Sequence, residues 1–236
     1  MKSILNISQE VADLSAVKRP DSLFNSASLS DSIFLSVAKS TLDSLLRYGD
    51  WPQLVREASF VTIPGKYYYP LSEVCSAFYS LLPNTIYIKD SKEKVIGAVT
   101  PDEWMKSKYI TNDDLNLKFR IEHGMIKFIS LPENPVKIVF QYRADVICLD
   151  AKTFAEKSSV TADSDLPIFD EYLVKLGMLW RWFKRSGLDY TEEYAEYERE
   201  VKKNFAASCA AGDIILAPTT DDITSKGVKL NVKVVC

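Results

Sequence analysis

The fold is decided by residues 176–190, which read LGMLWRWFKRSGLDY. Apolar residues recur at spacings of three and four through and just before this stretch, which predicts an amphipathic helix. Gly187 is a typical helix stop, and Asp189 can cap a second helix that runs to Gly212. Because the connection is so short, we expect the two helices to lie antiparallel and side by side. The expected apolar stripes are Ile168, Phe169, Tyr172, Leu173, Leu176, Leu179, Trp180 and Phe183, then Tyr190, Tyr194, Tyr197, Val201 and Phe205.

Further helix signals lie upstream of this hairpin. The hairpin is expected to begin at residues 163–167, DSDLP, where an Asp or Ser cap precedes a proline suited to the first turn. Residues 3–17 show the apolar spacing of a short amphipathic helix. A second helix is expected to start at a cap formed by Ser30 or Asp31 and to end near Gly49. We therefore expect the N-terminal helices and the C-terminal hairpin to form one bundle.

The middle of the chain, residues 53–147, changes to the period-two pattern of β-strands. Residues 58–63 and 67–71 flank the turn signal Pro64-Gly65-Lys66, which predicts an antiparallel hairpin. The other expected elements are a hairpin around residues 90–92, a short helix from Pro101 to Tyr109, a hairpin around His123-Gly124, and a strand over residues 136–142. This block is predicted to be mostly antiparallel.

The last 24 residues, 213–236, differ from the rest of the chain. They begin with the apolar Ile214-Ile215-Leu216 and end with an alternating pattern that predicts a strand. Such a strand is suited to pair with the edge of a sheet, either of its own chain or of a partner. The alternating apolar residues are Val228, Leu230, Val232 and Val234.

Together these patterns predict an α+β chain in four parts. They are N-terminal helices over residues 1–52, a β-rich domain over 53–147, a linker and helical hairpin over 148–212, and an extended tail over 213–236.

Composition narrows the function classes. The chain has 236 residues, with 29 Lys and Arg against 32 Asp and Glu. The net charge of −3 argues against a strongly basic nucleic-acid binder, because phosphate contacts usually need a surplus of Lys and Arg. The one histidine, His123, and four cysteines without a CxxC pair suggest neither a zinc site nor a hydrolase triad. No phosphate-binding glycine loop and no run of 18 apolar residues occurs. We expect no catalytic residue, cofactor, metal or membrane span.

Residues 176–190, followed by Glu193, Tyr194 and Tyr197, resemble the C-terminal helical hairpin of tailed-phage head-to-tail adaptor proteins of the tail tubular protein A type. The order of the other elements is similar as well. A helix pair ends in Gly49-Asp50-Trp51, and a β block opens with residues 51–54 and 58–65. The resemblance covers roughly residues 30–211, and the hairpin is its specific part.

The resemblance implies a structural protein of the virion and no enzyme. Such proteins form a ring, usually of about twelve copies, beneath the portal vertex of the capsid. The ring extends the DNA channel and offers a docking surface to the next tail component. The implied partners are the portal protein and other tail or collar proteins, with double-stranded DNA passing through the lumen without specific binding. The implied location is the virion neck between capsid and tail, and the host cytoplasm during assembly.

Interface residues are expected on the hairpin and in the tail. Trp182 lies off the predicted stripe and beside Arg181 and Arg185, and aromatic and Arg residues are enriched at interface hot spots. We expect these three residues at a subunit or portal contact; the alternative is that Trp182 covers its own bundle. The tail is expected to contribute Ile214, Ile215, Leu216, Val228, Leu230, Val232 and Val234. The core is expected to contain Trp180, Phe183, Tyr194 and Tyr197.

Three other functions compete with this one. The chain could be another collar or tail ring protein of the virion. It could bind single-stranded nucleic acid through the tyrosines at 67–69 and the basic cluster Arg181, Lys184 and Arg185. Since Lys66 is the one basic residue near those tyrosines in sequence, a sheet-face role is favoured for them. An enzyme could use the carboxylate pairs Asp113-Asp114 or Glu192-Glu193, but adjacent carboxylates on a helix point in different directions.

Overall fold

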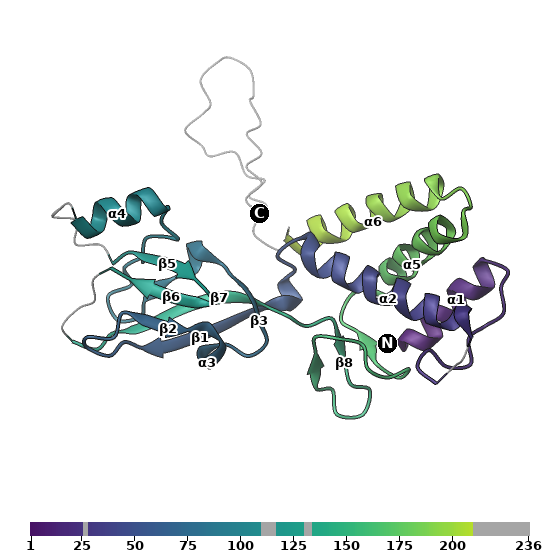
Figure 1. Cartoon of the computed structure of the whole chain (residues 1–236), viewed down its shortest axis with the longest axis horizontal. Coiled ribbons are helices and arrows are strands. Elements are labelled where there is room, and N and C mark those ends of the chain that lie inside the picture. The colour runs from purple at the N-terminus through teal and green to yellow at the C-terminus, as the bar shows by residue number, and fades with distance from the viewer. Residues whose placement is uncertain (26–27, 110–116, 130–133, 210–236) are drawn as a thin grey trace, which may run out of the picture. The chain divides into compact units, whose positions relative to one another are not determined.

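In the computed structural model, all residues are described except 26–27, 110–116, 130–133 and 210–236. The described residues form a mixed α+β structure with six α-helices and antiparallel sheets (Figure 1), so the predicted α+β class is confirmed. The chain divides into two compact units. Among the described residues, a helical unit comprises Met1–Pro52 and residues 162–209, and a β unit comprises Gln53–Thr161. Residues 148–161, which we expected in a linker to the hairpin, thus group with the β unit.

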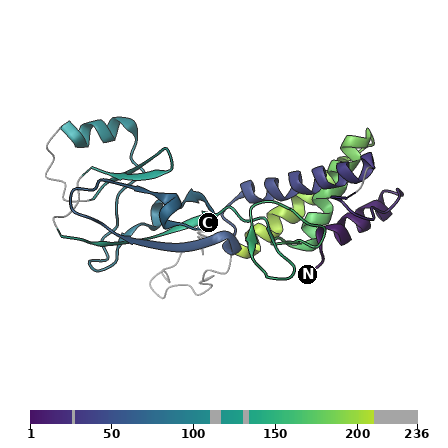
Figure 2. The same ribbon diagram turned by 60° about the horizontal axis from the view of Figure 1, so that its bottom comes forward.

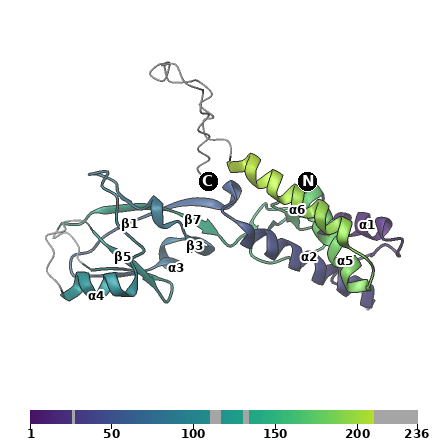
Figure 3. The ribbon, with the colours of Figure 1, turned by 90° about the horizontal axis from the view of Figure 1, so that it is seen from above.

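Four helices make up the described part of the helical unit. Helix α5 contacts each of the other three, and Figures 1 and 3 show it beside them. A two-residue strand, β10 (Leu166–Pro167), precedes α5 in the chain. The helices are α1 (Ile4–Leu14), α2 (Leu29–Tyr48), α5 (Glu171–Ser186) and α6 (Thr191–Cys209).

The start of α2 lies slightly before the predicted caps. Ser28 is the N-cap residue, so Ser30 and Asp31 belong to the first turn of the helix. An acidic residue in the first turn still interacts favourably with the helix dipole, which explains why Asp31 resembles a cap in the sequence.

The start of α5 was predicted too early. Asp170 caps the helix, and its carboxylate accepts a hydrogen bond from the Leu173 amide at 3.1 Å. The upstream acids have other partners: Asp163 accepts from the Leu23 amide at 2.8 Å, and Asp165 accepts from the Ala162 amide at 3.0 Å. Asp163 and Asp165 therefore stabilise the loop that precedes α5 and do not cap the helix.

The end of α5 is as predicted. Gly187 adopts a left-handed conformation with a φ of 73°. The Leu188 amide donates to the Phe183 carbonyl at 3.0 Å, as in a Schellman motif. The turn then passes directly into α6, where Asp189 accepts from the Thr191 amide at 3.0 Å. The expected helical hairpin is therefore present.

Aromatic rings hold the helical unit together. The rings of Phe34 on α2 and Trp182 on α5 stack with centroids 4.1 Å apart and an interplanar angle of 4°. Trp51 is buried, packs edge-on against Phe205 of α6, and donates from its indole nitrogen to the Leu45 carbonyl at 2.8 Å. Since a ring pair contributes roughly 0.5–1.5 kcal/mol beyond its burial, these contacts tie the two ends of the chain together.

The β unit contains two principal sheets and two short helices. In the first sheet, β7 pairs with each of the other three strands; in the second, the order is β2-β6-β5. Figures 1 and 2 both show α4 lying outside β5. The first sheet contains β1 (Val55–Val61), β3 (Phe78–Leu81), β4 (Tyr87–Ile88) and β7 (Lys137–Ala144), and the second β2 (Tyr68–Pro70), β5 (Phe119–Glu122) and β6 (Met125–Phe128). The other elements are α3 (Leu71–Val74), α4 (Pro101–Tyr109), the 3₁₀ turns Pro52–Leu54 and Pro83–Thr85, and the hairpin strands β8 (Cys148–Leu149) and β9 (Glu156–Lys157).

One predicted hairpin of this unit is wrong. Strand β1 pairs with β7, and β2 pairs with β6, so the segments 58–63 and 67–71 belong to different sheets. Their contact is through side chains instead, because the rings of Phe60 and Tyr69 lie 4.5 Å apart in the core between the sheets. The turn signal at Gly65 marks a corner from one sheet to the other.

The hairpin expected around residues 90–92 is reduced to an isolated bridge between Tyr87 and Lys94, whereas the remaining predictions for this block agree with the structure. Strands β5 and β6 form a hairpin whose turn residues, His123 and Gly124, both have positive φ, as type I′ turns require. Helix α4 starts at Pro101 behind a capping box, in which the Thr100 amide donates to Glu103 at 3.0 Å. Strand β7 buries Ile138, Phe140 and Tyr142 on one face, as its alternation predicts.

Candidate interaction surface

Two adjoining shallow depressions lie on the first sheet, and Glu57, Tyr87 and Val139 contribute to the lining of both. Within the described part of the chain, no group of three or more His, Cys, Asp or Glu is placed to hold a metal ion. No described helix is long and apolar enough to cross a membrane. His123 is exposed at its turn, and burial raises the pKa of the Cys75 thiol to about 11.

Trp182 does not lie on the surface, which corrects its expected role as a subunit contact. Only 7% of the residue is exposed, because its ring is stacked on Phe34 of α2. Helix α5 is covered by α2 on one side and by α6 on another, so residues off the α6-facing stripe are buried too. The alternative in which Trp182 covers its own helices is the correct one.

Arg181 is also held inside the hairpin. Its Nη1 donates to the Gly177 carbonyl at 3.0 Å, and its guanidinium lies 4.2 Å from the centroid of the Trp180 ring. Burial lowers the pKa of Arg181, while neighbouring Tyr197 raises it. Within the described chain no carboxylate lies within ion-pair distance of this guanidinium. Arg181 is therefore packed against its own hairpin. Of the three residues predicted at a subunit or portal contact on this helix, Arg185 is the exposed one.

The outer surface of the hairpin combines exposed apolar groups with acids. Tyr194, which we expected in the core, is 41% exposed, and Leu188 in the turn is exposed as well. The Tyr172 hydroxyl donates to Glu196 at 2.6 Å, which links α5 to α6 at the surface. Of the other expected core residues, Tyr197 is buried, and Trp180 and Phe183 are half-buried.

The tyrosines at 67–69 acquire basic neighbours in the fold beyond Lys66, which precedes them in sequence. Tyr68 is 55% exposed on β2 and lies opposite Lys127 of β6, which in turn lies opposite Arg120 of β5. The guanidinium of Arg120 lies over the ring of Trp104 of α4 at 5.8 Å. The strand register thus brings an aromatic residue and two cations into one row, and both cations form ion pairs with Glu122 at the end of β5.

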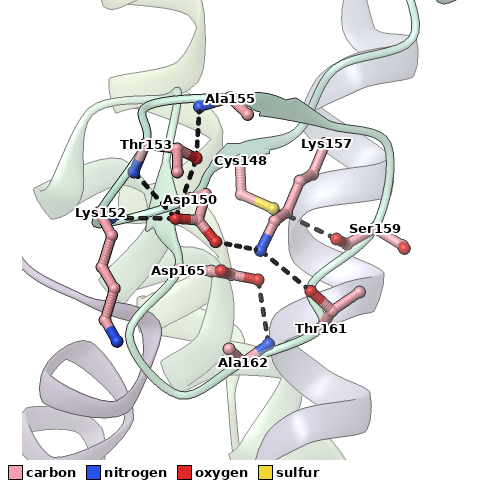
Figure 4. A network of polar contacts seen from close by, with 10 residues as sticks. All are labelled: Cys148, Asp150, Lys152, Thr153, Ala155, Lys157, Ser159, Thr161, Ala162 and Asp165. Carbon is pink, nitrogen blue, oxygen red and sulfur yellow. Dashed lines mark hydrogen bonds and ion pairs between the residues drawn. The ribbon is translucent and has the colours of Figure 1, made fainter.

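A polar network fixes the β8–β9 hairpin, as Figure 4 shows. Asp150 Oδ1 accepts hydrogen bonds from the amides of Lys152 and Thr153, both at 3.0 Å. Its Oδ2 forms an ion pair with Lys157 at 2.9 Å, and Lys157 donates to the Thr161 hydroxyl at 3.1 Å. The hydrogen bond and charge of Lys157, followed by the two amide bonds, hold the pKa of Asp150 well below its usual range.

The tip of this hairpin exposes an aromatic ring. Phe154 is 64% exposed and has a φ of 55°, in the left-handed region that bulky residues rarely adopt. Sequence analysis missed this feature because the segment is polar overall and resembles a linker. The available signal was Asp150 with Thr153 three residues later, a pattern in which side chains bond the backbone of a turn.

The remaining predicted interface residues lie outside the described part of the chain. They are Ile214, Ile215, Leu216, Val228, Leu230, Val232 and Val234. Comparison of the chain with protein-family models and with curated proteins finds no match.

Proposed function

We propose that this chain is a structural virion protein that forms an adaptor ring between the capsid portal and the tail. The observation that carries the proposal is the helical hairpin α5–α6, whose residues 176–190 show the specific part of the resemblance to tailed-phage adaptors. The chain order also supports it, since two helices precede the β unit and two follow it, and all four belong to one compact unit.

In this proposal the four helices act as one bundle that gives each subunit a rigid body. Contacts of α5 with α1, α2 and α6 and the stacked Phe34–Trp182 pair support that role. The β unit contacts a neighbouring subunit or the next tail component. The tail, residues 213–236, contacts the portal or an adjacent subunit in this proposal.

The ring extends the DNA channel without holding DNA tightly. The net charge of −3 supports this, because strong phosphate binding would impede the passage of the duplex. The proposed site of action is the neck of the virion, after assembly in the host cytoplasm, and no catalytic step is assigned to the chain. Another collar or tail ring position would use the same surfaces with a different neighbour.

The test is to mix the full chain with the portal ring from the same source and to measure particle mass by mass photometry. The adaptor role predicts that the portal particle gains the mass of about twelve copies and shows an extra ring by negative-stain microscopy. If the portal is intact and gains no mass at micromolar protein concentration, the chain is not its adaptor.

A second candidate function is favoured by one specific observation, the row formed by Tyr68, Lys127 and Arg120. Exposed aromatic rings stack on unpaired bases, and nearby cations bind phosphates. This function predicts that a fluorescent single-stranded oligonucleotide binds the chain and is released by salt. The Tyr68→Ser variant should weaken binding about tenfold, and Tyr79→Ser, at another exposed tyrosine, should not. Equal binding by both variants would remove the candidate.

A further inference from the structure

Strand β1 leaves one edge of the first sheet unpaired. It lies at the end of the strand order and pairs with β7 alone among the strands that the structure describes. With seven residues it is the longest edge strand of the two principal sheets, since β3 and β5 have four residues each and β2 has three. An edge of this length is a template for one more strand.

The register shows which backbone groups of β1 face the open side. The Thr62 amide, directly after β1, donates to the Val136 carbonyl at 2.9 Å. Because successive residues of an antiparallel strand alternate in direction, the amides and carbonyls of Glu57, Ser59 and Val61 point away from β7. All three residues are exposed, and no backbone hydrogen bond among the described residues uses these groups. Helix α3 contacts β1 (Figure 1) but forms no such bond with it.

The inward side chains of β1 are less well covered than those of its partner strand. In the register, Ala58 lies opposite Phe140, and Phe60 lies opposite Ile138. Both residues of β7 are fully buried, whereas Ala58 and Phe60 are only half-buried. The core between the sheets therefore ends at β1 in an apolar row that one further strand would cover.

We propose that residues 228–234 of the chain's own tail add to the first sheet as a strand beside β1. This segment, VKLNVKV, has the same length as β1, and its apolar residues alternate with polar ones. In a strand paired with β1, the apolar residues continue the row of Ala58 and Phe60, and the polar residues lie on the exposed face. No other stretch of residues 210–236 alternates in this way over seven positions.

The position at which the tail leaves α6 keeps β1 within its reach. Phe205 of α6 packs against Trp51 with ring centroids 5.2 Å apart, and β1 begins four residues after Trp51. Helix α6 ends at Cys209, and 18 residues separate this end from the proposed strand. Eighteen extended residues span about 60 Å, whereas a strand of seven residues is about 23 Å long. Because the tether gives a local concentration on the order of millimolar, the chain's own segment outcompetes that of a second copy at micromolar protein concentration.

This pairing goes beyond the proposed function. In the adaptor ring the tail contacts the portal or an adjacent subunit, so the segment leaves β1 when the ring assembles. Before assembly, the paired segment covers an edge at which free copies could otherwise pair with one another. The pairing is tested on the free chain, so its outcome is independent of whether the chain adds mass to the portal.

The first test is hydrogen exchange of the free full chain, resolved by residue with NMR spectroscopy. The amides of Ser59 and Val61 should exchange at least about tenfold more slowly in the wild type than in the double variant Val232→Asp, Val234→Asp. The reason is that the two charges would lie on the apolar side of the segment, where they prevent pairing with β1. Equal exchange of these amides in the two proteins would overturn the inference.

Two controls separate pairing from folding. The amides of Ala58 and Phe60 face β7, so they should be equally protected in the wild type and in the Asp variant. The double variant Lys229→Gln, Lys233→Gln changes the polar side of the segment and should keep the slow exchange of Ser59. Fast exchange of Ser59 in this control would overturn the assigned orientation of the strand.

A photo-crosslinking amino acid at position 59 identifies the occupant of the edge. It is placed in the full chain, and light and heavy isotopic forms are mixed at micromolar concentration. Crosslinks to residues 228–234 within one molecule are expected. The same group at Tyr79, which is exposed on β3 at the other side of β7, should not reach this segment. Crosslinks from position 59 to other segments, crosslinks only between light and heavy chains, or none at all would overturn the inference.

Discussion

At the scale of single residues, Gly177 determines how closely α5 approaches both α2 and α6. A Cβ at this position would lie 2.5 Å from the Thr41 Cγ2 and 2.9 Å from the Tyr197 ring. Both neighbours are buried, and the methyl group of a β-branched side chain in a helix has little freedom to move.

Replacing Gly177 with Ala should therefore lower the stability of the protein, although alanine favours helix by about 1 kcal/mol. Overpacking costs about 1–3 kcal/mol, so we expect a net loss of about 1 kcal/mol in urea denaturation. The double variant Thr41→Ser, Gly177→Ala removes the methyl group that clashes and should recover part of the loss. A single variant as stable as the wild type would show that the helices can separate at this point.

At the scale of elements, the β8–β9 hairpin depends on the ionised form of Asp150. Its pKa is lower in the folded than in the unfolded state, chiefly through Lys157. The stabilisation is therefore fully present above the unfolded pKa of about 4 and is lost as pH falls through the folded value.

The Asp150→Asn variant should melt below the wild type at pH 7, and the difference should shrink as the pH is lowered below about 4. Scanning calorimetry at several pH values measures both effects. Lys157→Gln removes the main cause of the pKa shift and should show a difference that shrinks over the same range. A melting difference that is independent of pH would contradict the assignment of charge as the cause.

At the scale of elements too, local signals in the sequence predicted more than non-local ones. Gly187 and Asp189 fix the turn of the helical hairpin through bonds to residues within four positions, so their pattern sufficed. The pairing of β1 with β7 depends on a core formed by distant residues, and no local pattern encodes it.

The candidate surfaces likewise depend on contacts between residues that are distant in sequence, which local patterns do not predict. The prediction of an exposed Trp182 considered only the apolar stripe of α5 that faces α6. The helix also buries a second side, on which Trp182 stacks against Phe34 of α2. The row of Tyr68, Lys127 and Arg120 exists only through strand register. Phe154 could be recognised only once its φ and exposure were known, because a phenylalanine in a polar loop has no pattern of its own.

At the scale of the whole molecule, the proposed function assigns attachment to the C-terminal tail. Replacing Val232 and Val234 with Asp puts two charges on the apolar side of the expected strand, and buried unpaired charges are costly. We expect the variant to lose addition to the portal ring in mass photometry while its helical circular dichroism stays unchanged. Replacing Lys229 and Lys233 with Gln, on the other side of the alternation, is the matched control. Attachment that survives the Asp substitutions would remove the tail from the interface.

The division of the helical unit between the two ends of the chain has a consequence for biosynthesis. Helices α1 and α2 leave the ribosome before the β unit, but the helix that covers Phe34, α5, follows only after the whole β unit. The β unit is contiguous, so it can fold while synthesis continues, since domains generally fold as units. The apolar faces of α1 and α2 therefore stay uncovered until α5, more than a hundred residues later in the chain, has been synthesised. A nascent chain arrested before Glu171 should therefore bind chaperones through its N-terminal helices, and release should follow the emergence of α5.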